Sequence, residues 1–415
     1  MKPKLLSTLP GYTTRLFVAD VIAGVTVAMV ALPLSIAIAI ASGASPAAGL
    51  VTAVIGGLIV SALGGSRVQI GGPTGAFIVV VYGVIQQFGL DGLLLATLMA
   101  GVILIVGAVV RAGRLIALIP EPVIEGFTIG IAVIIAVSQL KDLLGQSIAR
   151  MPADFVEILP ALWAARGSIN LAALAIGLGT IVLIMTLKWL APRIPGSIVA
   201  IGIASGAVAL FALPVDTLQS RFGSLPNGIP MISLPPISAD LMLALLPSAL
   251  MIAFLAGVES LLSAVVADRM IEGAHRSNAE LLAQGAANVA SPLFGGLPVT
   301  GAIARTATNV RAGGRTPVAG IVHALTILLV MVAAAPLAAY LTMPALAGLL
   351  IVTAWVMSEP HRWPERWRAS ASDRVLLFLT FGLTVLSSLV VAIAVGTAIG
   401  LGLRSFRGKG AGHKS

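Results

Sequence analysis

Apolar segments separated by short stretches of glycine, proline and charged residues recur along the whole chain. Many are roughly 20 residues long, the length of α-helix that crosses about 30 Å of hydrocarbon. Lipid offers no partner to backbone N–H and C=O groups, so these segments are expected to be helices, and the ten-residue alternation of a transmembrane β-barrel is missing from the sequence. The pattern predicts an all-α membrane protein of about fourteen spans, at residues 19–41, 47–64, 72–88, 92–111, 122–143, 169–190, 195–213, 241–268, 280–296, 299–311, 317–336, 342–357, 374–388 and 389–404.

The composition of the chain excludes an ordinary soluble protein. Of its 415 residues, 58% are hydrophobic and 10% charged, and the mean hydropathy is +1.06, whereas about 25% of a typical soluble domain is charged. The chain has no cysteine, its four histidines show no metal-ligand spacing, and it contains neither a Walker loop nor a serine paired with a usable base. We therefore expect no enzyme, no metal and no cofactor, and no ATP-driven transport within this chain.

The distribution of basic residues predicts how the spans are oriented. The net charge is +9, which is better explained by topology than by contact with nucleic acid, because lysine and arginine stay in cytoplasmic loops. With the N-terminus in the cytoplasm, 20 of the 25 Lys and Arg residues fall in predicted cytoplasmic loops and tails, and one falls within a span. The predicted external loops hold Lys141, Arg150, Arg166 and Arg221. This bias predicts an even span count, both termini in the cytoplasm and a location in the bacterial inner membrane, and residues 1–15 are too polar for a cleavable signal peptide.

Two short sequences recur in spans that are seven apart. Ala23-Gly24-Val25 reappears as Ala256-Gly257-Val258, and Thr74-Gly75-Ala76 reappears as Thr300-Gly301-Ala302. A repeat of seven spans, an odd number, places the second copy upside-down relative to the first. The chain is therefore expected to consist of two inverted seven-helix repeats, as many secondary transporters do.

Spans three and ten each begin with helix-breaking residues. Gly71-Gly72-Pro73 opens one, and Gly295-Gly296-Leu297-Pro298 opens the other. A helix that begins inside the membrane presents unpaired N–H groups and a partial positive charge, which together suit an anion. We expect two half-helices that face each other near the midplane. The alternatives are that these glycines permit close helix packing, or that the breaks are surface loops.

Two charged residues fall well inside predicted spans. Arg305 follows the start of span ten by about one turn, and a guanidinium offers several donors to a carboxylate, sulfate or bicarbonate. Its alternative is to extend to the cytoplasmic face beside Arg311 and Arg315. Glu259, inside span eight, is expected to carry a proton or to ligate Na⁺, and its alternative is to pair with Arg305.

The chain resembles the sulfate permease (SulP) family of anion transporters, which includes the prestin-related proteins, from about Asp20 to about Gly400. The residues that carry the resemblance are Gly64-Gly65-Ser66-Arg67-Val68-Gln69-Ile70, Gly72-Pro73-Thr74-Gly75-Ala76-Phe77, Glu259-Ser260-Leu261-Leu262-Ser263, Pro292-Leu293-Phe294-Gly295-Gly296 and Gly301-Ala302-Ile303-Ala304-Arg305-Thr306-Ala307-Thr308-Asn309. The resemblance implies a core domain (about 19–111 and 241–336) that moves like an elevator against a gate domain (about 122–213 and 342–404), and a homodimer.

The resemblance also implies which residues bind the substrate. Substrate would lie between the half-helices of spans three and ten, beside spans one and eight. The substrate-binding residues are then Thr74, Gly75, Ala76, Phe77, Thr300, Gly301, Ala302 and Arg305. Glu259 matches the acidic position that couples transport to a cation, H⁺ or Na⁺, in some members.

The sequence departs from the family pattern in two places. Family members usually continue into a cytoplasmic STAS domain, and this sequence stops at Ser415 after a basic tail, so no such domain is expected here. Some relatives also place a glutamine and an aromatic residue after the proline of span one. Here Pro33 is followed by Leu34, and the later position is Ile38, so span one is expected to lend the pocket few polar groups.

We therefore expect a secondary transporter of small anions, with dicarboxylate, bicarbonate, sulfate or chloride as candidate substrates. One rival is a nucleobase permease of the same architecture, which would need acidic or amide side chains in both spans eight and ten. Another is a membrane motor or scaffold that binds anions with little flux. Anion binding without uptake in liposomes would indicate the latter.

Overall fold

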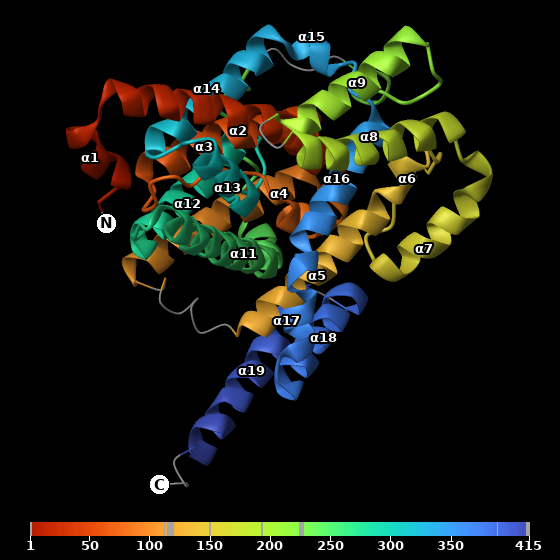
Figure 1. Cartoon of the computed structure of the whole chain (residues 1–415). Coiled ribbons are helices and arrows are strands. Elements are labelled where there is room, and N and C mark those ends of the chain that lie inside the picture. Colours follow the sequence, from red (N-terminus) through yellow and green to blue (C-terminus); the bar gives the residue numbers. More distant parts are fainter. Residues whose placement is uncertain are drawn as a thin grey trace.

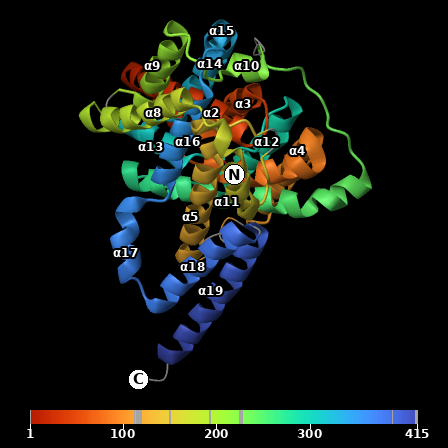
Figure 2. The ribbon, with the colours of Figure 1, turned by 90° about the vertical axis from the view of Figure 1, so that its right-hand side faces the viewer.

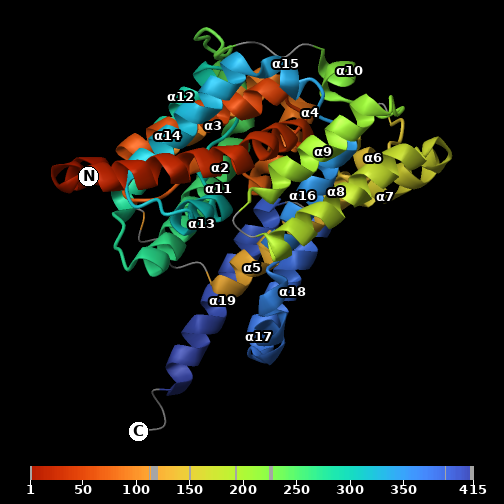
Figure 3. The same cartoon turned by 45° about the horizontal axis from the view of Figure 1, so that its top comes forward.

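The computed structural model describes residues 2–111, 113, 120–148, 151–191, 194–223, 228–387 and 389–411, and the side chains of all of these except 389, 390 and 403–411. Most of the described chain is helical, and the longer helices fall into two groups that lie side by side (Figure 1, Figure 3). The basic residues Arg114, Arg150, Arg193 and Lys414, used above to predict topology, lie outside the described residues.

The first group packs around the two predicted half-helices. Helix α4 packs against α11 and α12, and α14 packs against α2 and α3. The members are α2 (Thr14–Ala41), α3 (Pro46–Leu63), η2 (Gly75–Phe77), α4 (Ile78–Val109), α11 (Ala239–Ile271), α12 (Ser277–Leu293), α13 (Ile303–Arg311) and α14 (Pro317–Ala333), together with the strands β1 (Gly71–Gly72) and β2 (Thr300–Gly301). Small side chains such as Ala28, Ala31, Ala53 and Ala256 are fully buried between these helices and allow close approach of their backbones.

The second group comes from the segments between and after these helices. Helix α5 packs against α16, α18 and α19, and α8 packs against α16 and α9 (Figure 2). The members are α5 (Glu121–Ser138), α6 (Leu140–Leu143), α8 (Leu171–Leu190), α9 (Gly196–Leu210), α16 (Met343–Met357), α18 (Ala371–Leu386) and α19 (Leu389–Ala411). Each group thus joins a segment from the first half of the chain to one from the second half.

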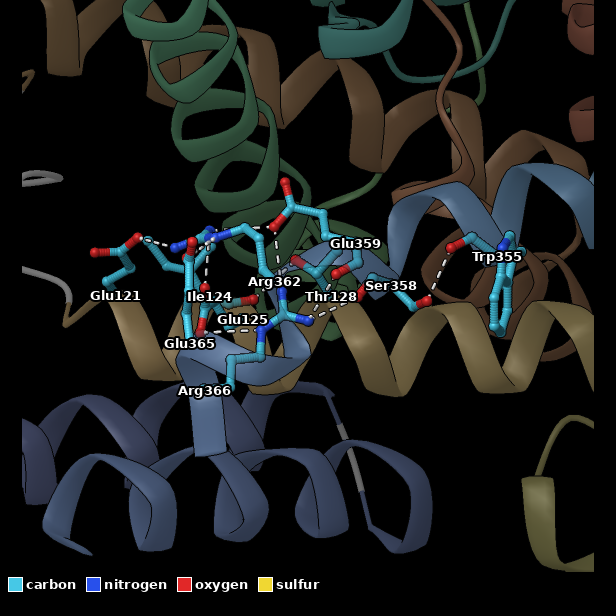
Figure 4. A network of polar contacts seen from close by, with 10 residues as sticks. All are labelled: Glu121, Ile124, Glu125, Thr128, Trp355, Ser358, Glu359, Arg362, Glu365 and Arg366. Carbon is cyan, nitrogen blue, oxygen red and sulfur yellow. Dashed lines mark hydrogen bonds and ion pairs between the residues drawn. The ribbon is translucent and has the colours of Figure 1, made fainter. Parts of the chain in front are cut away.

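An ion-pair network holds the start of α5 to the segment that follows α16, which contains η6 (Pro360–Arg362) and α17 (Trp363–Arg368) (Figure 4). Arg362 lies 3.0 Å from Glu121 and 2.8 Å from Glu125, and Arg366 lies 3.4 Å from Glu125. Arg366 also pairs with Glu359 at 3.1 Å. The network joins residues about 240 positions apart, so it ties the two halves of the second group together.

Short helices lie before and between the long helices, and none of them was predicted. They are α1 (Lys4–Thr8), η1 (Leu9–Gly11), α7 (Phe155–Ala164), η5 (Ala165–Ser168), α10 (Leu218–Phe222) and α15 (Ala335–Ala338). Helix α7 buries only Ile158 and Leu162 and leaves Val156, Leu159 and Trp163 exposed. Its ten residues are too few to cross a bilayer, which is why the span pattern does not reveal it.

Each predicted span contains helical backbone, but not every helix has the length of a complete span. Seven helices of the described residues are long and apolar enough to cross a membrane by length and composition, and three shorter apolar helices accompany them. The total of fourteen spans and the orientation of the termini stay predictions. Gly89, with φ of 73° and ψ of −177°, interrupts α4 between the predicted third and fourth spans, as the interval from 88 to 92 indicates.

The outer surface suits lipid. Leu171, Trp189 and Leu210 are 75%, 82% and 79% exposed, and many other large apolar side chains are exposed with them. A soluble protein rarely leaves contiguous apolar surface uncovered, so helices α8 and α9 are expected to face hydrocarbon.

Asp20 ties α2 to α14. Helix α2 begins at Thr14, capped by Thr13, and Asp20 is fully buried within it. Its carboxylate accepts hydrogen bonds from the backbone N–H of Thr316 at 3.2 Å and from the Thr316 hydroxyl at the start of α14. The hydroxyl of Tyr12 also donates to it, and burial together with the Asp20 charge raises the pKa of Tyr12 to about 12, so the phenol stays a donor at neutral pH.

Candidate functional site

The two helix breaks meet. Strands β1 and β2, which precede η2 and α13, pair antiparallel with Gly71 opposite Gly301 and Gly72 opposite Thr300. The N–H of Ala302 also donates to the carbonyl of Ile70 at 2.9 Å. Segments 228 to 232 positions apart therefore place two helix starts beside each other inside the first group. The alternative that the breaks are separate surface loops is wrong, because both strands are buried.

The first helix start presents amide groups and a polar side chain. The hydroxyl of Thr74 donates to Oε2 of Glu259 at 2.8 Å, so it does not cap η2, whose first N–H groups have no side-chain acceptor. A Cβ added at Gly75 would lie 3.0 Å from Sδ of Met357 and 3.4 Å from Cδ1 of Ile135. This end of η2 therefore faces α16 and α5 of the second group. Phe77 is 2% exposed in the apolar core, where it packs under the site.

The second helix start is fixed by contacts with α11 and with Gln69. The hydroxyl of Thr300 donates to the carbonyl of Ala256 at 3.0 Å, and a Cβ at Gly301 would overlap the side-chain amide of Gln69. Helix α13 has no side-chain cap at Ala302, which is buried. The start of α13 thus keeps uncapped N–H groups, like the start of η2, while its outer face is fixed by packing.

Arg305 joins the two breaks. Its side chain is 2% exposed, and Nη2 donates to the carbonyl of Pro73 at 3.0 Å and to the hydroxyl of Ser35 at 3.1 Å. Its Nε and Nη1 have no hydrogen-bond partner among the described residues, and a Cβ added at Gly72 would lie 2.5 Å from Nη1. The alternative that Arg305 extends to the cytoplasmic face is therefore wrong. Two unpaired donors on a buried guanidinium are chemically suited to an oxyanion.

Glu259 lies beside the first helix start and is half-buried. Its partner is Thr74, and among the described residues no ion pair within 4.0 Å joins it to Arg305. The alternative of a direct pair with Arg305 is therefore not what this structure contains. A carboxylate that is not neutralised by contact with an arginine can accept a proton or a small cation.

Four polar residues behind the breaks were not predicted as part of the site. Gln69 Nε2 donates to Ser260 Oγ at 2.7 Å, and Ser260 Oγ donates to Glu280 Oε1 at 3.1 Å. Glu280 is fully buried in α12 and accepts the backbone N–H of Gly65 at 2.9 Å. Glu280 is the first residue of predicted span nine, where a charge is common, so the rule that singled out Arg305 does not select it. Ser35, which contacts Arg305, gave no such signal.

Two cavities of about 570 and 400 Å³ lie elsewhere. One surrounds the start of α12 near Lys2 and Arg276, and the other lies near Asp142 and Asn170. Neither is lined by a residue predicted to bind the anion. The candidate site is therefore defined by the unpaired N–H donors of Arg305 and by the two helix starts, and α5 and α16 pack over the start of η2.

Comparison with known proteins gives the family. The sequence model of the sulfate permease family matches residues 17–380 of this chain. A protein of Bacillus subtilis (strain 168), described as the putative sulfate transporter YvdB, is 43% identical over 388 residues, which are 93% of this chain and 73% of that protein. The bicarbonate transporter BicA of a Picosynechococcus species is 32% identical over 395 residues, which are 92% of this chain and 69% of that protein.

Solved structures have the same fold. The transmembrane domain of a cyanobacterial bicarbonate transporter BicA superposes with a TM-score of 0.84 at 32% identity and covers 92% of this chain and 98% of that one. The overall structure of SLC26A9 gives a TM-score of 0.87 and covers 97% of this chain and 68% of that one, and at 19% identity it supports the fold alone. This multi-pass, largely helical membrane protein therefore belongs to the sulfate permease family.

Proposed function

We propose that the chain is a secondary transporter that binds one small anion between the starts of η2 and α13. The observation that carries the proposal is the buried guanidinium of Arg305, whose Nε and Nη1 are unpaired where the two breaks meet. The uncapped N–H groups of both helix starts add partial positive charge at the same place. Together they would form a preorganised anion site.

The donor chemistry favours an oxyanion. A guanidinium presents two parallel N–H groups that match two oxygens of sulfate, bicarbonate or a carboxylate, whereas chloride offers a single acceptor sphere. Relatives described as sulfate and bicarbonate transporters are consistent with this chemistry. Sulfate and bicarbonate are therefore the first substrates to test. A nucleobase is disfavoured, because it would need an acidic or amide group from α13 where this chain has Arg305.

Glu259 is proposed as the coupling residue. It lies next to the anion site through its hydrogen bond with Thr74, and a carboxylate at this place can bind H⁺ or Na⁺. Binding the cation near Arg305-bound substrate would offset part of the anion's charge. This arrangement supports symport, in which both ions cross together.

Alternating access is proposed to follow the division into two packing groups. The first group holds both helix starts and would be the moving core, and the second group would be the gate. Their contact at Gly75, Ile135 and Met357 covers the start of η2 on one side. Sliding of the core along this contact would carry the site across the membrane. A homodimer built through the gate is part of the same proposal.

Uptake into proteoliposomes tests the proposed function. Purified chain is reconstituted, and accumulation of radiolabelled sulfate, bicarbonate, succinate and chloride is followed with H⁺ and Na⁺ gradients imposed separately. We expect saturable uptake of at least one oxyanion, abolished in Arg305→Ala. Uptake of uracil but of no anion would contradict the proposal, and anion binding without flux would instead support a motor or scaffold.

A further inference from the structure

His323 is a buried titratable group to which the proposed function gives no role. It lies in the middle of α14 and is fully buried. Neither Nδ1 nor Nε2 has a hydrogen-bond partner among the described residues. An imidazole always carries at least one N–H, and leaving it unpaired inside a protein costs free energy, so such a group needs an explanation.

The ring lies at the interface between α14 and α3, next to the anion site. A Cβ added at Gly57 of α3 would lie 3.5 Å from Nδ1 of His323 and 3.3 Å from the carbonyl oxygen of Gly71. Gly71 is the first residue of β1, and the next residue, Gly72, lies against Nη1 of Arg305. His323 is therefore behind the same two-residue strand that Arg305 contacts.

A second unpaired polar atom lines the same interface. Gly320, one turn before His323, faces the hydroxyl of Ser61, one turn after Gly57, and Ser61 Oγ has no partner among the described residues. The two glycines bring the helices close together. The interface thus contains three polar atoms, Ser61 Oγ and both nitrogens of His323, where apolar packing would be expected.

The charges around His323 are few. Helix α3 contains no titratable residue, and α14 contains none besides His323. On α2, Asp20 is bonded to Thr316, two turns before His323. Lys4 of α1, whose pKa is lowered by burial and by Arg276 and Arg67, bonds through its backbone N–H to the carbonyl of Gly64 at the end of α3, and α15 has no titratable residue. On the side of β1, the charged group is the guanidinium of Arg305, whose Nη1 lies against Gly72, the neighbour of Gly71.

We propose that His323 binds a proton together with the anion. A proton on His323 would place a second buried cation near Arg305, so the neutral ring is favoured as long as that guanidinium is not compensated. An oxyanion on Arg305 supplies the opposite charge and makes the protonated ring favourable. By linkage, protonation of His323 then strengthens anion binding by the same factor.

The consequence is a specific coupling. A proton from the side where the anion binds attaches to a ring nitrogen and is released when the anion leaves on the other side, so the anion and the proton cross together. This inference rests on the proposed function, and it makes His323 a proton site in addition to any cation held at Glu259.

Proton uptake on binding tests the inference directly. Purified full-length protein in weakly buffered detergent solution is titrated with sodium sulfate, with a pH-indicator dye and calorimetry recording protons and heat. We expect the wild type to take up roughly one proton per sulfate, and His323→Asn to bind sulfate within a few-fold of wild type while losing this uptake. His361→Asn, the control, removes an exposed imidazole on η6 and is expected to retain the proton uptake.

Several results would overturn the inference. Wild type that binds sulfate without proton uptake, or His323→Asn with undiminished uptake, refutes it. Loss of uptake in Glu259→Gln with uptake retained in His323→Asn assigns the proton to Glu259 and also refutes it. Failure of the wild type to bind or transport any oxyanion is a different result, because it removes the proposed function itself.

A transport measurement covers the case in which the asparagine variant does not fold. His323→Gln is made in parallel, and both variants are checked by size exclusion and thermal unfolding. In proteoliposomes an inward proton gradient is expected to stimulate sulfate uptake by the wild type and by His361→Asn. The same gradient is expected to leave sulfate uptake by the His323 variants unchanged. Equal stimulation in a folded His323 variant contradicts the inference, and the wild-type proton titration stands as a test even if neither variant folds.

Discussion

Arg305 is the residue on which anion binding depends in the proposed site. Arg305→Ala removes two unpaired donors, and since a hydrogen bond to a charged group contributes about 1.5 kcal/mol or more, a loss of about 3 kcal/mol corresponds to roughly 100-fold weaker sulfate binding. Arg305→Lys should recover little, because one ammonium cannot reach Pro73, Ser35 and the ligand together. Calorimetric titration with sulfate measures the affinity. Arg166→Ala, which removes an exposed arginine whose side chain donates to the carbonyl of Trp163, is the control, and unchanged affinity in Arg305→Ala would remove Arg305 from the site.

Glu259 acts on coupling rather than on binding in this proposal. Glu259→Gln keeps an acceptor for the Thr74 hydroxyl but cannot bind a cation, so sulfate should still bind while its uptake no longer follows an imposed Na⁺ or H⁺ gradient. Gradient-driven uptake in proteoliposomes reports this directly. Glu157→Gln, on the exposed face of α7, is the matched control. A gradient response equal to that of wild type in Glu259→Gln would contradict the coupling role.

The site residues differ in how visible they are to sequence reasoning. Arg305 and Glu259 are charges within apolar segments, and the cost of such charges in lipid makes them conspicuous. Glu280 stands at the predicted start of a span, where a charge is common, and Ser35 and His323 carry no signal, because a serine or a histidine is common in many helices. Their importance depends on which atoms face them, and only the packing of α2, α3 and α14 against the breaks determines that.

At the scale of elements, the pairing of β1 with β2 fixes how the two helix starts face each other. Gly301 is not in a positive-φ conformation, so alanine fits its backbone, but the added Cβ would overlap Gln69. Gly301→Ala should therefore displace β2 and weaken sulfate binding by roughly tenfold, as expected for overpacking that costs about 1–3 kcal/mol. In a Gln69→Ala background the clash is gone, so Gly301→Ala should weaken sulfate binding much less than it does in the wild type. A double-mutant cycle measures this difference. Gly179→Ala, where the Cβ meets open space, is the control, and additive effects of the Gly301 and Gln69 changes would contradict the clash.

The hydrophobic pattern predicts the long helices well and their ends less well. Apolar length decides where a helix can cross lipid, and so the segments of α2, α3, α4, α8 and α11 follow from it. The first turn of α2 is polar and extends beyond the apolar run because Thr13 caps it, and α7 is amphipathic and too short. Helix α12 carries Glu280, Gln284, Asn288 and Ser291 on one buried face. Glu280, Asn288 and Ser291 bond to the loops before the breaks, and Gln284 donates to Glu280. This polar stripe weakens the hydropathy signal while it positions the site.

At the scale of the whole molecule, the family and its fold agree with the sequence interpretation, whereas the division into core and gate stays a prediction that motion must test. The inverted repeat explains why segments from both halves of the chain meet in each packing group. Neither the repeat nor the hydropathy pattern identifies the group that moves, because a moving helix and a fixed helix have the same hydropathy. The contact of Gly75 with Met357 is where the two groups meet closest to the site, and it offers a way to arrest them.

Cross-linking tests that motion, because the chain has no native cysteine. In Gly75→Cys/Met357→Cys, oxidation should join η2 to α16, stop sulfate uptake almost completely and be reversed by a reducing agent, since transport would require the two groups to slide past each other. Pro120→Cys/Gly400→Cys joins α5 to α19 within the second group, where the Cβ atoms would lie about 3.2 Å apart, and its oxidation should leave uptake unchanged. The single-cysteine variants separate the cross-link from the substitutions, and mass spectrometry verifies that each bond forms. If uptake continues with η2 fixed to α16, the two groups do not move relative to each other at this contact, and the elevator must be replaced by a gate that opens elsewhere.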